Sequence, residues 1–295
     1  MKICITGITG MVGNALAKHL RDIGHEVCGL SRREDQSKHI YEWNAEKGTI
    51  DLNAFEGVDG IVHLAGDNVS EGKWTDKKKK KIRESRTKGT ELLVNSLLGL
   101  KEKPKFLISG SAIGYYGDKE EQVFNEQSEP GDDFLAKVCV DWEKMTEPIK
   151  KSSIRLITAR IGVVISLEGG ALKKMLPAFK FGLGGRLGSG KQYMSWVELG
   201  ELVLMFTFLI ESNLDGPFNC VSQKPLSNDE FTKTLSKVIK RPAFFHLPAW
   251  LIKIIFGEMG EQLLLSSTRV EPLKFIESKY PFKYRDLKEA LEDLL

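Results

Sequence analysis

The stretch TGITGMVG, residues 6–13, joins a short apolar run to a segment in which apolar residues recur at helical spacing. The run Lys2–Thr6 is rich in apolar and β-branched residues, which predicts a strand, and Met11–Gly24 is predicted to be a helix. A second apolar run, Glu26–Leu30, predicts another strand. This strand–helix–strand order indicates a parallel sheet, because two parallel strands need a crossover connection between them.

The same alternation continues along the first half of the chain. Further strands are predicted at 60–64, 105–109 and 155–165, with helices at 77–100 and 134–152. These elements predict the α/β class, with a Rossmann-like doubly wound parallel sheet.

After Ser166 the sequence becomes rich in glycine and then mainly helical in pattern. A Rossmann domain is therefore predicted at 1–165 and a smaller, mainly helical substrate lobe at 166–295, which includes a helical segment at 247–295. The apolar run at 216–222 is expected to rejoin the sheet as a strand.

Composition excludes several classes of partner. The 295 residues are 41% hydrophobic and 28% charged, which predicts an ordered globular chain, and a net charge of +3 is too small to indicate nucleic acid binding. The four cysteines lie far apart without metal-ligand spacing, so we expect no metal site, and free thiols favour a cytoplasmic location. No apolar run could span a bilayer, and we expect a small-molecule partner rather than a membrane.

Two local features allow alternative interpretations. Five consecutive lysines occur in Asp76–Lys81, but lysines on every side of a helix indicate a solvated charged turn rather than a nucleic acid site. The amphipathic stretch LPAWLIKIIFGEMG, 247–260, could rest on a membrane; we expect it instead to pack against the lobe or against a second subunit of a homodimer.

Residues 6–13 also have the chemistry of a dinucleotide site. A helix N-terminus presents unpaired N–H groups and a positive dipole to a pyrophosphate, and glycines allow the backbone to approach it closely. A purely structural turn is the alternative. The predicted cofactor contacts in this stretch are Gly7, Thr9, Gly10, Met11, Val12 and Gly13.

The end of the second strand predicts which dinucleotide is bound. A site that prefers NAD places an acidic residue there to accept hydrogen bonds from the ribose, whereas this chain has Ser31, Arg32 and Arg33 before the first carboxylate, Glu34. Two guanidinium groups and a hydroxyl complement the additional phosphate of NADP. We therefore expect NADP (NADPH) as the cofactor, with a solvated basic turn as the alternative.

Several motifs together give the chain a family resemblance. It resembles an extended short-chain dehydrogenase/reductase over nearly its whole length and, more closely, the YfcH-like epimerase family with its C-terminal domain of unknown function. The motifs are TGITGMVG (6–13), HLAG (63–66), RTKGT (86–90), SGSAIGYYG (109–117), DFLAKVCVDWE (133–143) and GLGGRLGSGKQYMSW (182–196).

The resemblance implies further cofactor contacts. Val163 would lie beside the nicotinamide, and Arg86 would replace an asparagine that contacts the cofactor in many relatives; without the resemblance Arg86 would be a surface charge. The full set of implied contacts is Leu64, Ala65, Gly66, Arg86, Ser109 and Val163.

The residues that perform hydride chemistry in the superfamily are missing. Its enzymes use a tyrosine as acid and base, with a lysine four residues later that lowers the phenol pKa. The matching positions on the helix at 134–152 are Phe134 and Val138, which cannot move protons. Ser111 retains the position of the serine that holds the substrate oxygen.

The remaining candidates for catalysis are Ser111, Tyr115 and Tyr116, with Glu143 expected to cap or pair within its own helix. If the protein is an enzyme, a phenol from the loop after Ser111 is the best available acid. The alternative is that Tyr115 only makes a hydrophobic contact. Two functions stay open: an NADP-dependent oxidoreductase or epimerase-like enzyme, and a non-catalytic NADP-binding redox sensor or regulatory protein.

The glycine-rich stretch at 182–196 is the candidate substrate site. Its cations and exposed N–H groups favour an anionic ligand such as a nucleotide sugar or a carboxylate. A flexible surface loop without a ligand is the alternative. The predicted substrate contacts are Arg186, Lys191, Gln192 and Trp196.

Overall fold

A computed structural model describes all 295 residues, and an eight-stranded sheet lies at its centre. All neighbouring strands are parallel except the last pair, in which β4 is antiparallel to β3. Across the sheet the strands are β13 (Gly216–Cys220), β8 (Arg155–Ile161), β6 (Phe106–Ala112), β5 (Gly60–His63), β1 (Lys2–Thr6), β2 (Glu26–Ser31), β3 (Ile40–Asn44) and β4 (Thr49–Ile50).

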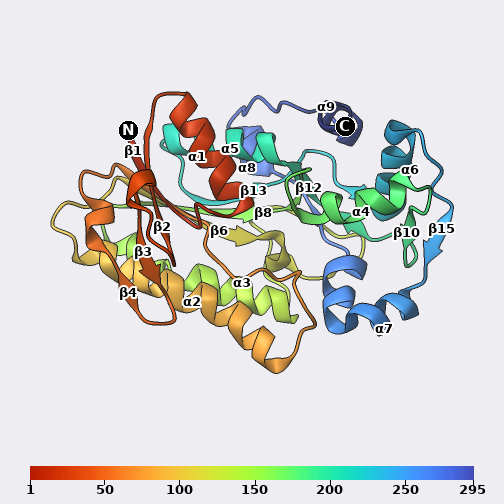
Figure 1. The fold of residues 1–295 in the computed structure, drawn as a ribbon, viewed down its shortest axis with the longest axis horizontal. Helices are drawn as coiled ribbons and strands as arrows, with labels where there is room; N and C mark the ends of the chain where they lie inside the picture. The colour runs from red at the N-terminus through yellow and green to blue at the C-terminus, as the bar shows by residue number, and fades with distance from the viewer.

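Helices cover both faces of this sheet (Figure 1). Alternate side chains of each strand point to opposite faces, so Ile3 and Ile5 enter one buried cluster while Cys4 enters the other. This two-sided burial confirms the predicted α/β doubly wound fold. One face carries α1 (Met11–Asp22), α5 (Leu199–Glu211) and α8 (Leu273–Glu277), and the other carries α2 (Asp76–Gly99) and α3 (Phe134–Lys144).

The remaining segments of the second half of the chain build a mainly helical lobe at the right of Figure 1. Its buried cluster includes Phe179, Trp196, Phe231 and Leu291. The helices are α4 (Gly170–Lys180), α6 (Asn228–Ile239), α7 (Ala249–Gly260) and α9 (Leu287–Leu294); the strand pairs are β9 (Val163–Ile165) with β12 (Trp196–Glu198), β10 (Gly185–Leu187) with β15 (Phe245–Leu247), and β11 (Tyr193–Met194) with β14 (Leu226–Ser227).

Two of the predicted elements differ from the observed ones. The helix predicted at 134–152 ends at Lys144 and continues as a 3₁₀ segment that contains Pro148. The strand predicted at 155–165 divides at Gly162, after which β9 leaves the main sheet to pair with β12. The strand predicted at 216–222 does rejoin the sheet, as β13 beside β8.

No helix has both the length and the apolar character needed to cross a bilayer. No group of three or more histidine, cysteine, aspartate or glutamate side chains is arranged to hold a metal ion.

Candidate nucleotide-binding site

The turn between β1 and α1 is closely packed around its glycines. Gly7 has a φ of +70°, in the left-handed region, and a Cβ atom on Gly13 would lie 2.3 Å from the carbonyl oxygen of Gly7. Helix α1 begins after Gly10, which offers no side-chain cap, so the N–H groups of Met11 and Val12 have no partner in the chain. This arrangement suits a pyrophosphate.

A buried series of hydrogen-bonded polar side chains supports this turn. The hydroxyl oxygen of Thr6 lies 2.6 Å from Nδ1 of His63 and accepts hydrogen bonds from the backbone N–H groups of Leu64 and Ala65. Nε2 of His63 lies 2.9 Å from the hydroxyl of Thr90. Burial lowers the pKa of His63 to about 4. Sequence reasoning missed this support; the available signal was a polar residue at the end of each of two adjacent apolar strands.

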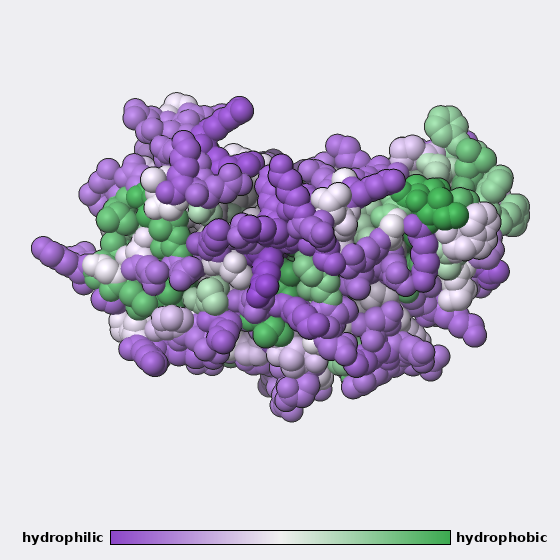
Figure 2. Space-filling view, turned by 90° about the horizontal axis from the view of Figure 1, so that it is seen from below, coloured by the Kyte–Doolittle hydropathy of each residue, from purple (hydrophilic) through white to green (hydrophobic).

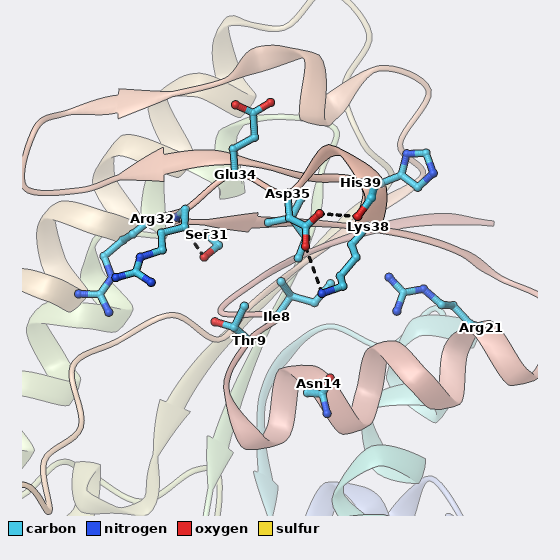
Figure 3. A pocket seen from close by; sticks show the side chains of 13 residues that line it. Ile8, Thr9, Asn14, Arg21, Ser31, Arg32, Glu34, Asp35, Lys38 and His39 are labelled. Carbon is cyan, nitrogen blue, oxygen red and sulfur yellow. Dashed lines mark hydrogen bonds and ion pairs between the residues drawn. The ribbon is translucent and has the colours of Figure 1, made fainter.

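Two hollows meet where β2 ends. The larger, of about 1460 Å³, lies between this strand end and α1, and the smaller, of about 400 Å³, reaches Gly7 and residues 64–66. Both are lined by Thr9, Ser31 and Arg32. Figure 3 shows Thr9 below Ser31, between the end of β2 and the first turn of α1. The sequence-predicted residues of the turn and of the strand end are therefore brought together.

The strand end carries uncompensated positive charge. Arg32 and Arg33 are exposed and form no salt bridge. The carboxylate of Asp35 is occupied by Lys38 at 3.1 Å and by the hydroxyl of Ser37 at 2.6 Å. An anion in the larger hollow would therefore meet two free guanidinium groups.

Arg86 positions the loop after β5 rather than projecting into solvent. Its guanidinium group donates hydrogen bonds to the carbonyl of Asp67 at 3.1 Å and to that of Ile82 at 3.0 Å, and it lies over the ring of Trp142. A Cβ atom on Gly66 would be 3.3 Å from the guanidinium carbon. Arg86 therefore lies directly beneath the loop that lines the smaller hollow.

The lysine run also fixes this loop, so the expected solvated turn is wrong for part of it. Lys78 and Lys81 both pair with the carboxylate of Asp67. Lys79 binds both carboxylate oxygens of Glu258, in α7, at 2.8 and 3.0 Å. The run thus joins the nucleotide half of the molecule to the C-terminal lobe.

Two other predicted contacts lie away from these hollows. Ser109 is 1% exposed inside the sheet, so its side chain cannot reach a cofactor, and that prediction is corrected. Val163 begins β9 and is partly exposed; its place beside a nicotinamide stays a prediction.

Ser111 lies in a closed polar cluster. Its hydroxyl donates a hydrogen bond to Glu143 at 2.7 Å, and the whole residue is only 3% exposed. The same carboxylate accepts two hydrogen bonds from Arg160, both at 2.9 Å. Glu143 therefore pairs with a strand of the sheet, not within its own helix, and the Ser111 hydroxyl is engaged by Glu143.

The two candidate tyrosines surround the same arginine. Tyr116 is completely buried, donates to Asn219 at 2.7 Å and accepts from Arg160 at 3.0 Å; burial raises its pKa to about 12. The ring of Tyr115 lies 3.5 Å from the Arg160 guanidinium carbon, and burial raises its pKa as well. Tyr115 lines a hollow between α3 and the sheet edge that shares no lining residue with the nucleotide hollows. Tyr116 is therefore held in a buried hydrogen-bond network, whereas a role for the partly exposed Tyr115 as the acid stays a prediction.

Helix α3 supplies no ionisable group where the superfamily has its tyrosine and lysine. Phe134 packs edge-on against Trp74, with the amino group of Lys79 4.6 Å from its ring centre, and Val138 is buried. Neither position therefore carries a group that could replace the missing tyrosine and lysine.

The candidate substrate residues divide into two pairs. Arg186 and Lys191 are exposed on the lobe. Gln192 is buried and donates to two backbone carbonyls at 3.0 Å, and Trp196 is 1% exposed, with its indole N–H bound to another carbonyl. Gln192 and Trp196 thus hold the loop together, which corrects their assignment to a substrate.

Comparisons with known proteins agree along the whole chain. The model described as "NAD dependent epimerase/dehydratase family" matches residues 3–220, and one described as a domain of unknown function (DUF1731) matches residues 247–294. An epimerase family protein of Mycobacterium bovis is 38% identical over 98% of this chain and 96% of its own length. One of Bacillus subtilis is 36% identical over 100% and 98%. The crystal structure of the human epimerase family protein SDR39U1 with NADPH has a TM-score of 0.92, 30% identity, and coverage of 100% and 99%.

Proposed function

Because the chain belongs to the NAD-dependent epimerase/dehydratase family, as its motifs indicated, we propose that it binds NADPH in preference to NADH. The observation that carries this proposal is the free positive charge at the end of β2, directly beside the glycine turn. The pyrophosphate would lie at the first turn of α1, and the 2′-phosphate would lie between Thr9, Ser31 and Arg32.

The residues present fit this cofactor. The position that holds a ribose-binding carboxylate in NAD sites is basic here. The carboxylates that also line the larger hollow, Glu34 and Asp35, come later in the chain, and Asp35 is paired with Lys38. The human relative that was crystallised with NADPH supports the same choice. Leu64, Ala65 and Gly66 would line the other side of the bound nucleotide, held in place by Thr6 and Arg86.

We further propose that the protein acts as an NADPH-binding regulatory or sensing protein rather than as an oxidoreductase. Bound NADPH could supply a hydride, but a carbonyl substrate would also need a proton donor. Phe134 and Val138 cannot provide one, and Ser111 and Tyr116 are committed to the Arg160 cluster. Tyr115 lies over Arg160, in a hollow that shares no lining residue with the nucleotide hollows. These contacts favour cofactor binding without turnover over the alternative of an enzyme acting on a small anionic or sugar substrate.

Arg32→Ala is expected to weaken NADPH binding about 10- to 100-fold, because a hydrogen bond to a charged group contributes roughly 1.5–3 kcal/mol. NADH lacks the phosphate, so its affinity should change by no more than about twofold. Titration calorimetry with both nucleotides measures this. Arg241→Ala, an exposed arginine far from the turn, is the matched control. Equal losses for NADPH and NADH would show that Arg32 does not bind the phosphate.

A second experiment separates binding from chemistry. NADPH absorbance is followed while the protein is incubated with a panel of carbonyl compounds and nucleotide sugars. We expect NADPH to remain unoxidised under conditions in which calorimetry shows it bound. Turnover with any member of the panel would overturn the regulatory proposal and restore the enzyme alternative, while leaving the cofactor assignment intact.

A further inference from the structure

The end of the C-terminal lobe exposes an unusual number of large apolar side chains. Phe244 is 90% exposed and Phe181 is 81% exposed, values normally found for polar residues. Figure 2 shows hydrophobic side chains projecting at this end of the molecule, on the right. We call this surface the apolar tip; it consists of Phe181, Leu183, Phe244, Phe245, Trp250, Ile254 and Ile255.

The fold holds these side chains outward. β10 and β15 pair in parallel, which places the segment before Gly185 beside the segment before Phe245. Helix α7 starts two residues after β15 and buries Ile252 completely, so Trp250 and Ile254, on its other side, face solvent at 63% and 68% exposure. Their exposure is a consequence of a packed helix, not of a loose end.

The surroundings of the tip are predominantly positive, although Lys233 pairs with Asp229 and Lys253 pairs with Glu261. The two segments that build this end of the lobe, residues 169–191 and 231–257, contain ten lysines and arginines and no aspartate or glutamate. Lys180, Lys240 and Arg241 are exposed, form no salt bridge and lie next to the tip phenylalanines in sequence. The whole chain carries only +3, so the rest of the molecule is net acidic.

We propose that the apolar tip docks the protein on the surface of an anionic phospholipid bilayer. Aromatic and aliphatic side chains would enter the boundary between headgroups and acyl chains, while the surrounding lysines and arginines would remain among anionic headgroups. A second copy of the chain would bring the same positive charge against the tip, and a nucleic acid would leave the aliphatic side chains without an apolar partner. The contact is peripheral, since no helix can span a bilayer.

This proposal replaces the expectation of no membrane partner. The sequence shows the amphipathic pattern at 247–260 but not which side of α7 is buried. The pairing of β10 with β15, which adds Phe181 and Phe244 to the same surface, is visible only in the structure.

Vesicle co-sedimentation of the full-length protein tests the proposal. Vesicles of equal parts phosphatidylglycerol and phosphatidylcholine are compared with vesicles of phosphatidylcholine alone. We expect binding to the anionic vesicles that falls with added salt, and a loss of at least about tenfold in the partition coefficient for Phe181→Ser/Phe244→Ser and for Lys240→Glu/Arg241→Glu. Because all four side chains are exposed, these variants should fold, which NADPH binding and circular dichroism verify.

Matched changes far from the tip serve as controls. Leu52→Ser alters an apolar side chain with 53% exposure, and Lys101→Glu/Lys103→Glu reverses two exposed charges at the end of α2. Both control variants should bind vesicles like the unmodified protein. Equal binding to both vesicle types, equal loss in the controls, dimers that disappear in the phenylalanine variant, or binding of single- or double-stranded DNA through Lys240 and Arg241 without vesicle binding would each overturn the proposal.

Discussion

Replacing Arg160 by methionine is expected to lower the free energy of unfolding by about 3–5 kcal/mol, because it leaves a largely buried carboxylate without its charged partner. Arg160 is 4% exposed and binds Glu143 through two hydrogen bonds, and it also donates to Tyr116. The remaining donor to Glu143 would be the hydroxyl of Ser111. One hydrogen bond from an uncharged hydroxyl cannot offset the loss of a bidentate ion pair.

Chemical denaturation at neutral pH measures this effect. Removing both charges, in Arg160→Met/Glu143→Leu, should recover much of the lost stability, since two apolar side chains of similar size often replace a buried ion pair at little cost. Lys105→Met, which breaks an exposed pair with Asp59, is the control and should cost at most about 1 kcal/mol. If Arg160→Met costs no more than this control, the cluster does not stabilise the fold.

The same cluster shows why the candidate catalytic residues could not be assigned from sequence. Ser111, near the end of β6, and Tyr115 and Tyr116, just after it, do come together in space, as their spacing suggests. Their partner Arg160, however, lies more than forty residues later along the chain. No local pattern indicates that β8 places a guanidinium group among them, where it binds Glu143 and Tyr116 and lies over the ring of Tyr115.

The nucleotide turn, in contrast, could be predicted because its determinants are local. Gly7, Gly10 and Gly13 lie within one strand–turn–helix unit, and the backbone geometry required there excludes a Cβ atom at Gly13. Arg32 comes directly after the next strand, so its positive charge is placed beside the turn by the same local unit. Short-range sterics and short-range charge determine both features, so the residues alone carry the information.

Features that depend on pairing between distant segments were missed or wrong. The lysine run was expected in solvent, but Lys79 pairs with Glu258, almost two hundred residues away. Strands β3 and β4 were not predicted, because their length and mixed composition give no clear alternation. The division of the strand at Gly162 could be predicted only if the pairing of β9 with β12 were already known.

Because His63 is neutral in the folded protein, we expect the stability of the fold to depend on pH. The hydroxyl oxygen of Thr6 already accepts hydrogen bonds from two backbone N–H groups, so it can offer only its own proton to Nδ1 of His63. Nε2 then carries the proton and donates to Thr90. A second proton on the ring would face an oxygen with no free lone pair, in a site without a nearby carboxylate to stabilise the charge.

We therefore expect stability to fall by about 3 kcal/mol as the pH is lowered from 6.5 to 4. The folded-state pKa of His63, about 4, lies below the ordinary value of 6.5, so the unfolded chain binds more protons across this interval and acid favours unfolding. Above about pH 7.5, where the unfolded-state histidine is also neutral, the histidine adds almost no pH dependence. The loss should also weaken NADPH binding, since Thr6 holds the backbone of Leu64 and Ala65 beside the cofactor turn.

Urea denaturation between pH 4 and 7 tests this against His63→Gln, which has no titratable group. The difference in unfolding free energy between the two proteins should change by about 3 kcal/mol over the interval, because the contributions of all other groups cancel in the comparison. The control His39→Asn removes an exposed histidine from a left-handed position that asparagine tolerates, and its difference from the unmodified protein should stay nearly constant. A constant difference for His63→Gln as well would mean that His63 accepts a second proton as readily in the folded protein as in the unfolded chain, and that the hydrogen-bonded polar side chains supporting the turn do not hold it neutral.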